Sequence, residues 1–298
     1  MGKIKLTILA ILLGSINIMA QDPIFLQPLE TNVNLNPALV GNDSVARLNL
    51  IYRNQWPKLA GNFVTPSVNF YQYFPKLNAY AGINCLNDNQ ARGTLISNNV
   101  SIFYSQNINI KQVLFRPSLE IAYGDRKLNT TKITFGDIID GRYGSVWPVS
   151  QPLTPYKKYV DFNIGTVAYY KKLLVGFSIH HLNQPDIGMQ GTYQIPITYG
   201  LQFGYHIMIN KIVLSPYAIY IKQQNYQSLL IGANALLLNH LNVGLSYRTL
   251  SSIICNVGYQ NKFFKINYSY DATSAKNLFT PAGSHELYLS FRLNSLRL

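Results

Sequence analysis

The sequence has few charged residues, few cysteines and no long apolar run beyond its first 20 residues. Charged residues make up 12% of the chain, whereas about 25% is usual for a soluble domain. The composition therefore argues against an ordinary soluble domain. No apolar run after residue 20 reaches the length that a helix needs to cross a bilayer, so membrane-spanning helices are excluded.

Residues 1–20 are predicted to be a cleaved secretory signal peptide. Lys3 and Lys5 form a basic start, a largely apolar stretch follows, and Ala20 ends a plausible cleavage site. The alternative, a transmembrane anchor, is disfavoured because the apolar stretch is too short and is diluted by polar residues. Cleavage would remove two lysines and lower the formal charge from +13 to +11.

The basic excess does not indicate a nucleic-acid-binding protein. Lys and Arg number 25 against 12 Asp and Glu, but they are scattered singly along a chain that is expected to be secreted. Nucleic acid binding would call for a clustered patch. Anionic lipid headgroups are a sufficient explanation for the basic excess.

Short segments of alternating apolar and polar residues fill the chain from residue 45 onward. Residues 264, 266, 268 and 270 are aromatic or aliphatic, for example, whereas 265, 267, 269 and 271 are polar. This is the period of a strand with one apolar face. We predict fourteen strands, at 45–54, 67–73, 78–87, 98–107, 113–124, 159–170, 173–181, 197–206, 212–222, 227–237, 241–248, 252–259, 263–271 and 286–293.

The lengths of the predicted connections favour a membrane barrel over a soluble sandwich, which periodicity alone cannot do. Alternate connections are short, whereas 125–158, 182–196 and 272–285 are long. Short turns at one end and long loops at the other are typical of bacterial outer-membrane barrels, as are abundant aromatic residues, here including 22 Tyr. The predicted fold is therefore an all-β transmembrane outer-membrane barrel of about 14 antiparallel strands, spanning residues 45–298.

Residues 21–44 are polar and rich in turns, without sustained periodicity. They are predicted to be an irregular N-terminal segment, either a periplasmic lead-in or a plug in the lumen. Cys85 and Cys255 fall on the apolar, lipid-facing side of two distant strands, so free thiols are expected despite an oxidising compartment.

Three groups of residues are candidates for catalysis or metal binding. His180 and His181 are adjacent on a strand, and should point to opposite faces instead of chelating one ion. Ser178 and His180 share the lumen face, where a lipid-active enzyme could not use them. Asp137 and Asp140 lack the denser carboxylate spacing of a calcium loop. We therefore expect no enzyme, no metal and no cofactor.

Charged residues of both signs are predicted to face the lumen. In a narrow barrel they would pair, and in a wide pore they would stay in water, so the sequence does not settle conduction. The predicted lumen charges are Arg47, Arg53, Arg116, Glu120, Asp161, Arg248, Lys265, Asp271, Glu286 and Arg292.

The mature sequence resembles the PorP/SprF family of outer-membrane proteins of type IX secretion and gliding motility. The resemblance rests on the order and spacing of motifs along the whole mature chain. The motifs are QDPIFLQ at 21–27, NPA at 36–38 with Gly41, YRNQWP at 52–57, FGD at 135–137, HLNQP at 181–185, YR at 247–248, YSYD at 268–271 and GSHE at 283–286. Residues 294–298, which follow the last predicted strand, depart from barrels that end on an aromatic residue.

The resemblance implies a barrel that works with type IX components and anchors, or assists the export of, a secreted surface protein such as a gliding adhesin. Family members associated with the core secretion and motor complex offer an alternative, and a pore for small or hydrophobic solutes is another. By the strand order, several motif residues converge at the extracellular mouth as candidate partner-binding residues. They are Arg53, Asn54, Gln55, Trp56, His181, Asn183, Gln184, Arg248, Asp271 and Glu286.

Overall fold

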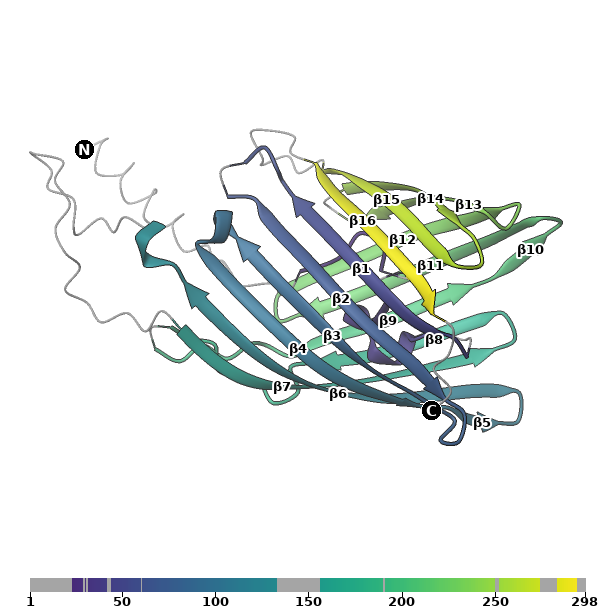
Figure 1. Cartoon of the computed structure of the whole chain (residues 1–298), viewed down its shortest axis with the longest axis horizontal. Helices are drawn as coiled ribbons and strands as arrows, with labels where there is room; N and C mark the ends of the chain where they lie inside the picture. The colour runs from purple at the N-terminus through teal and green to yellow at the C-terminus, as the bar shows by residue number, and fades with distance from the viewer. Residues whose placement is uncertain are drawn as a thin grey trace, which may run out of the picture.

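The computed structural model describes residues 23–28, 30, 32–41, 44–59, 61–132, 156–189, 191–249, 252–273 and 283–293. These residues form one closed antiparallel barrel (Figure 1). The predicted signal peptide, the motif at 135–137, and Asp137 and Asp140 lie outside the described residues.

Fourteen long strands form the barrel wall, as the alternation predicted. The circuit closes because β1 pairs with β16 and β9 pairs with β11. Two three-residue strands continue β4 and β9 beyond this circuit, where β5 pairs with β6 and β10 with β11. The strands are β1 (Ala46–Gln55), β2 (Phe63–Phe74), β3 (Ala79–Gln90), β4 (Leu95–Gln106), β5 (Ile108–Ile110), β6 (Val113–Leu128), β7 (Tyr156–Tyr170), β8 (Leu173–His180), β9 (Thr198–Tyr205), β10 (Ile207–Ile209), β11 (Ile212–Gln223), β12 (Tyr226–Leu237), β13 (Leu241–Arg248), β14 (Ser252–Gln260), β15 (Phe264–Thr273) and β16 (Ser284–Leu293).

The wall separates an apolar exterior from a polar lumen. On β6, Leu119, Ile121 and Tyr123 are exposed on the outside, whereas Ser118 and Glu120, which alternate with them, are buried inside. The two cysteines are free and exposed on the outer face, as predicted. An alternating strand with its hydrocarbon side outward is suited to lipid and unsuited to water.

The two ends of the barrel differ in their connections. At one end, the short-turn end, hairpins close in a few residues, such as Lys171 and Lys172 between β7 and β8. The opposite, long-loop end carries the connection between β8 and β9, which spans residues 181–197. Strand β1 runs from the short-turn end to the long-loop end, so Gln55 lies at the latter.

Helical structure in the described residues is limited to single turns, with α2 at Asn32–Leu35, η1 at Pro37–Leu39, η2 at Ala91–Gly93 and η3 at Thr130–Lys132. None of the described helices is long and apolar enough to cross a membrane. Both α2 and η1 belong to the N-terminal segment that precedes β1, and this segment fills the lumen.

Candidate functional site: the filled lumen and its cavity

The described residues between 23 and 41 run through the barrel from one end to the other. The carbonyl of Ile24 meets Arg53 near the long-loop end, whereas the carbonyl of Val40 meets Arg116 near the short-turn end. Phe25, Leu26 and Val40 are buried. The first described residues of the chain therefore lie towards the long loops, and the chain descends through the lumen before β1 begins.

Near the long-loop end, Arg53 and Glu286 clamp the backbone of the segment. These two residues are directly opposite each other in the β1–β16 register. The Glu286 carboxylate accepts hydrogen bonds from the backbone N–H of Leu26 at 2.6 Å and of Gln27 at 3.0 Å, and Arg53 donates to the carbonyl of Ile24. Hydrogen bonds to charged groups are stronger than neutral ones.

The clamp extends into a buried cluster of charges of both signs. Arg248 Nη1 lies 3.7 Å from Asp271 Oδ2, and both face the lumen close to Arg53. Arg53 is 3% exposed and Glu286 is fully buried. Buried charges of this kind are tolerated only when opposite charges and donors surround them.

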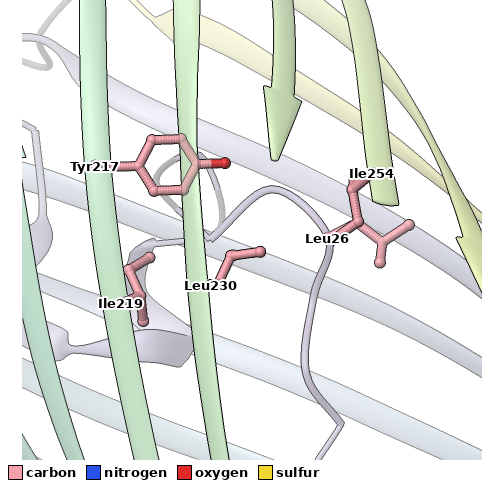
Figure 2. Packing of buried hydrophobic residues seen from close by; sticks show 5 residues of the cluster. All are labelled: Leu26, Tyr217, Ile219, Leu230 and Ile254. Carbon is pink, nitrogen blue, oxygen red and sulfur yellow. The ribbon is translucent and has the colours of Figure 1, made fainter. Parts of the chain in front are cut away.

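An apolar cluster fixes the same part of the segment. Leu26 packs against the inward-facing Tyr217, Ile219, Leu230 and Ile254 of β11, β12 and β14 (Figure 2). Burying one leucine side chain contributes roughly 1.5–3 kcal/mol. The alternation of an outer-membrane barrel does not require apolar residues on the lumen face. The contact with Leu26 explains why they occur here.

In the middle of the lumen, Asn36 ties the segment to three strands. Its side-chain Nδ2 donates to Gln202 Oε1 at 2.9 Å and to the carbonyls of Thr166 and Phe177 at 3.2 and 3.1 Å. Gly165 makes room for it, since a Cβ there would come within 2.1 Å of Asn36 Oδ1. The approach of the segment to the wall therefore requires a glycine at this point.

Near the short-turn end, Arg116 holds the last turn of the segment. Its Nη1 donates to the carbonyl of Val40 at 2.7 Å and, more weakly, to that of Ala38 at 3.4 Å. Its guanidinium lies 4.8 Å from the ring of Tyr80 and 5.4 Å from that of Tyr169. A planar cation near two aromatic rings with two carbonyl acceptors is a contact that lysine could not reproduce.

Above the segment, a cavity of about 220 Å³ lies in the long-loop half of the barrel. The segment contributes its floor through Ile24, Phe25 and Leu35. The walls carry apolar residues such as Ile187 and titratable groups of both signs. The acidic, basic and histidine residues that line the cavity are Asp88, Glu120, Arg126, Asp161, His180, His181 and Arg248.

The two adjacent histidines both line this cavity, so the prediction that they point to opposite faces is wrong. His181 follows the end of β8 with a φ of 59°, which turns its side chain away from strand alternation. Its Nδ1 lies 2.8 Å from Asp161 Oδ2, whereas His180 Nε2 lies 3.0 Å from the carbonyl of Leu35. Ser178 donates to the same carbonyl at 3.1 Å, so it helps to hold the segment.

The remaining predicted mouth residues lie at the long-loop rim. Trp56 has a φ of 55° and packs edge-on against Phe63, with ring centroids 5.7 Å apart. Asn183 continues the pairing of β7, since it bonds the N–H of Phe162 and the carbonyl of Val160. Asn54 and Gln55 end β1 and are half-buried, and Gln184 is an exposed residue of the turn after His181.

The predicted lumen charges lie in separate groups instead of one network. Glu120 accepts from Ser101 and Asn163 in the upper half, near Asp161. Lys265 pairs with Glu30 of the segment. Arg47 and Arg292 are directly opposite each other on β1 and β16, towards the short-turn end. No group of three or more His, Cys, Asp or Glu side chains with metal-binding geometry occurs among the residues that are described.

In the connection between β8 and β9, the carboxylate of Asp186 accepts three hydrogen bonds. It accepts from Lys157 at 2.6 Å and from the backbone N–H groups of Gly188 and Tyr193 at 2.9 and 2.8 Å. These hydrogen bonds, with that from Lys157 largest, lower the pKa of Asp186 to about 2. The carboxylate is therefore ionised at any physiological pH.

A closed antiparallel barrel with an apolar exterior, short turns at one end and a chain-filled lumen defines a bacterial outer-membrane barrel protein. The chain belongs to the PorP/SprF family of type IX secretion system membrane proteins, whose family model matches residues 17–291. It is therefore an outer-membrane protein associated with type IX secretion in a Gram-negative bacterium. By the usual orientation of such barrels, the long-loop end is extracellular and the short-turn end periplasmic.

Solved structures with similar folds are also outer-membrane barrels. The CymD monoaromatic hydrocarbon channel has a TM-score of 0.55 and 11% sequence identity, with 93% of this chain and 95% of that chain covered. The TodX monoaromatic hydrocarbon channel, as a deletion mutant, has a TM-score of 0.54 and 10% identity, with 89% and 94% covered. A FadL homologue of Pseudomonas aeruginosa has a TM-score of 0.50 and 9% identity, with 86% and 92% covered. At such identities the likeness concerns the fold alone. No curated protein matches the sequence.

Proposed function

We propose that this barrel binds a secreted protein at its extracellular mouth and holds that protein on the cell surface. The observation that carries the proposal is the filled lumen. Residues 23–41 are bonded to the wall at both ends and in the middle. A barrel whose lumen is occupied along its length is suited to presenting a surface, and the cavity of about 220 Å³ offers a concave site on its extracellular side.

The partner we expect is a protein exported by the type IX system, since the family associates the chain with that pathway. The cavity combines apolar walls with carboxylates and cations, so it can take an extended peptide segment with both apolar and charged side chains. Arg53, Asp271 and Glu286 are buried in the clamp and its charge cluster, and would act indirectly by fixing the cavity floor.

Filling the cavity tests the proposal. Ser228 lines the cavity and is 6% exposed. Ser228→Phe should reduce the amount of secreted protein that co-purifies with the barrel from native membranes, whereas Ser228→Ala should leave it unchanged. Both variants must show the heat-dependent gel mobility of a folded barrel. Retention of the partner by the Phe variant, or absence of any secreted partner from the wild type, would refute the proposal.

Passage of a small hydrophobic solute is the second candidate, favoured by the apolar residues of the cavity, including Phe25, Ile187 and Ile195. Two of the similar folds belong to proteins described as monoaromatic hydrocarbon channels. The bonded segment stands against free passage. Conductance in planar bilayers separates the two candidates, because an anchoring barrel should be silent and a channel should open.

A further inference from the structure

The periplasmic rim carries lysines in nearly every turn. Five of its six turns contain at least one, and the sixth, between β12 and β13, contains His240 instead. All of these lysines are exposed, and the turns hold no Asp or Glu. The residues of this lysine ring are Lys76, Lys111, Lys171, Lys172, Lys211 and Lys262. Among the ion pairs of the described residues, none involves a lysine of the ring.

The ring lies at the boundary of the apolar exterior. Lys111 follows the exposed Ile110, and Lys211 precedes the exposed Ile212. Lys171 Nζ lies 5.3 Å from the ring centroid of Tyr170, and Lys262 Nζ lies 4.8 Å from that of Phe263. A cation beside an outward aromatic ring, one residue from the hydrocarbon-facing wall, is at the level of lipid headgroups.

Two of the lysines occupy backbone positions that do not favour them. Lys111 and Lys171 have φ values of 54° and 53° at the first position of two-residue hairpin turns. Glycine, asparagine and aspartate adopt this conformation more readily than lysine does. The backbone conformation therefore does not account for lysine at these two positions.

We propose that the lysine ring binds the anionic phospholipid headgroups of the periplasmic leaflet. The positive charge of the lysines is complementary to that of the headgroups. The lysine ring also lies directly next to the lipid-facing apolar band of the wall. Lysines in five of the six turns, spread around the barrel, also fit a lipid annulus better than a one-sided protein contact. Each lysine near a charged membrane surface contributes about fivefold to binding.

The test uses the purified full-length protein in detergent with phosphatidylglycerol or phosphatidylcholine added, and native mass spectrometry to count retained lipids. The wild type should retain phosphatidylglycerol preferentially. Changing Lys111, Lys171, Lys172 and Lys262 to Gln together should lower that preference at least tenfold, and changing the same four to Arg should preserve it. The matched control removes four exposed cations at the extracellular end by changing Lys58, Arg92, Lys127 and Lys222 to Gln, and should retain the preference.

Three results would overturn the proposal. One is a wild type that does not distinguish the two lipids, and another is an equal loss in the extracellular control. The third is a Gln variant that keeps its lipid preference but loses a co-purifying periplasmic protein, which would make the ring a protein-docking surface. Folded-barrel gel mobility checks every variant. The Gln variant should still retain the secreted partner, so failure here is distinguishable from failure of the proposed anchoring function.

Discussion

Replacing Glu286 with Gln should release residues 24–28 of the N-terminal segment from the wall, although the side chain keeps nearly the same shape. Gln is nearly isosteric but neutral, and its NH₂ group would face a backbone N–H where Glu286 now accepts two hydrogen bonds. It also removes a negative charge beside the buried Arg53. Breaking one partner of a buried charge pair costs about 3–5 kcal/mol.

We expect docking of residues 24–28 to weaken by about 3 kcal/mol, which raises the population of the released state more than about 100-fold. Hydrogen–deuterium exchange of this segment in the purified full chain measures that population, because protection reports the local opening free energy. The exchange rate should therefore rise by a similar factor.

The matched control is Glu120→Gln, since Glu120 is an equally buried lumen carboxylate whose hydrogen bonds go to Ser101 and Asn163 of the wall. It should leave exchange of residues 24–28 unchanged. Arg53→Met should act like Glu286→Gln, and combining them should cost less than the sum, because the two residues share one interaction. Equal effects of Glu286→Gln and Glu120→Gln would refute the clamp.

Three further predictions concern other parts of the barrel. Arg116→Met should remove protection from Val40 and its neighbours at the periplasmic end, by about 2–3 kcal/mol in hydrogen exchange. Gly244→Val should destabilise the barrel by about 1–3 kcal/mol in denaturant unfolding, because its Cβ would meet Asn234 Oδ1 at 2.0 Å, whereas Gly204→Val, with no neighbour closer than 3.7 Å, should cost less. Folding lowers the pKa of Asp186, so the stabilisation that its carboxylate gives the β8–β9 connection is present above the ordinary carboxyl pKa and is lost as the pH falls through about 2. The amide chemical shifts of this connection should stay constant down to that pH and then change. Asp186→Asn should change these shifts at every pH.

The strands could be predicted from sequence because the membrane imposes one rule on every wall residue. Strand β13, for example, begins at Leu241 and ends at Arg248, which are also the limits of its alternation. Strands β6 and β7 were predicted too short, since the structure extends them to Leu128 and back to Tyr156. The added portions at 125–128 and 156–158 are rich in charged residues and lack the apolar–polar alternation, but they continue the sheet by backbone pairing, which alternation does not reveal.

The contacts of the lumen could be predicted only in part. The predicted strand order placed Arg53, Arg248, Asp271 and Glu286 at one end of the barrel, and in the structure the other three residues lie close to Arg53. It did not identify the chain's own N-terminal segment as the group that Arg53 and Glu286 hold, because an irregular segment has no period and hence no predictable register. Inward-facing Ile219, Leu230 and Ile254 on otherwise polar lumen faces were the available signal.

The path of the N-terminal segment also constrains how the barrel is made. Strand β16 pairs with β1, so the first and last strands of the chain form the seam that closes the barrel. Glu286 lies on that last strand, and the backbone of Leu26 that it binds lies inside the barrel. The segment must therefore be enclosed before the seam shuts, or be threaded afterwards through a finished pore. A folded domain fused ahead of Pro23 could not follow either route to the extracellular side, whereas an unstructured tag could, which makes the order of assembly accessible to experiment.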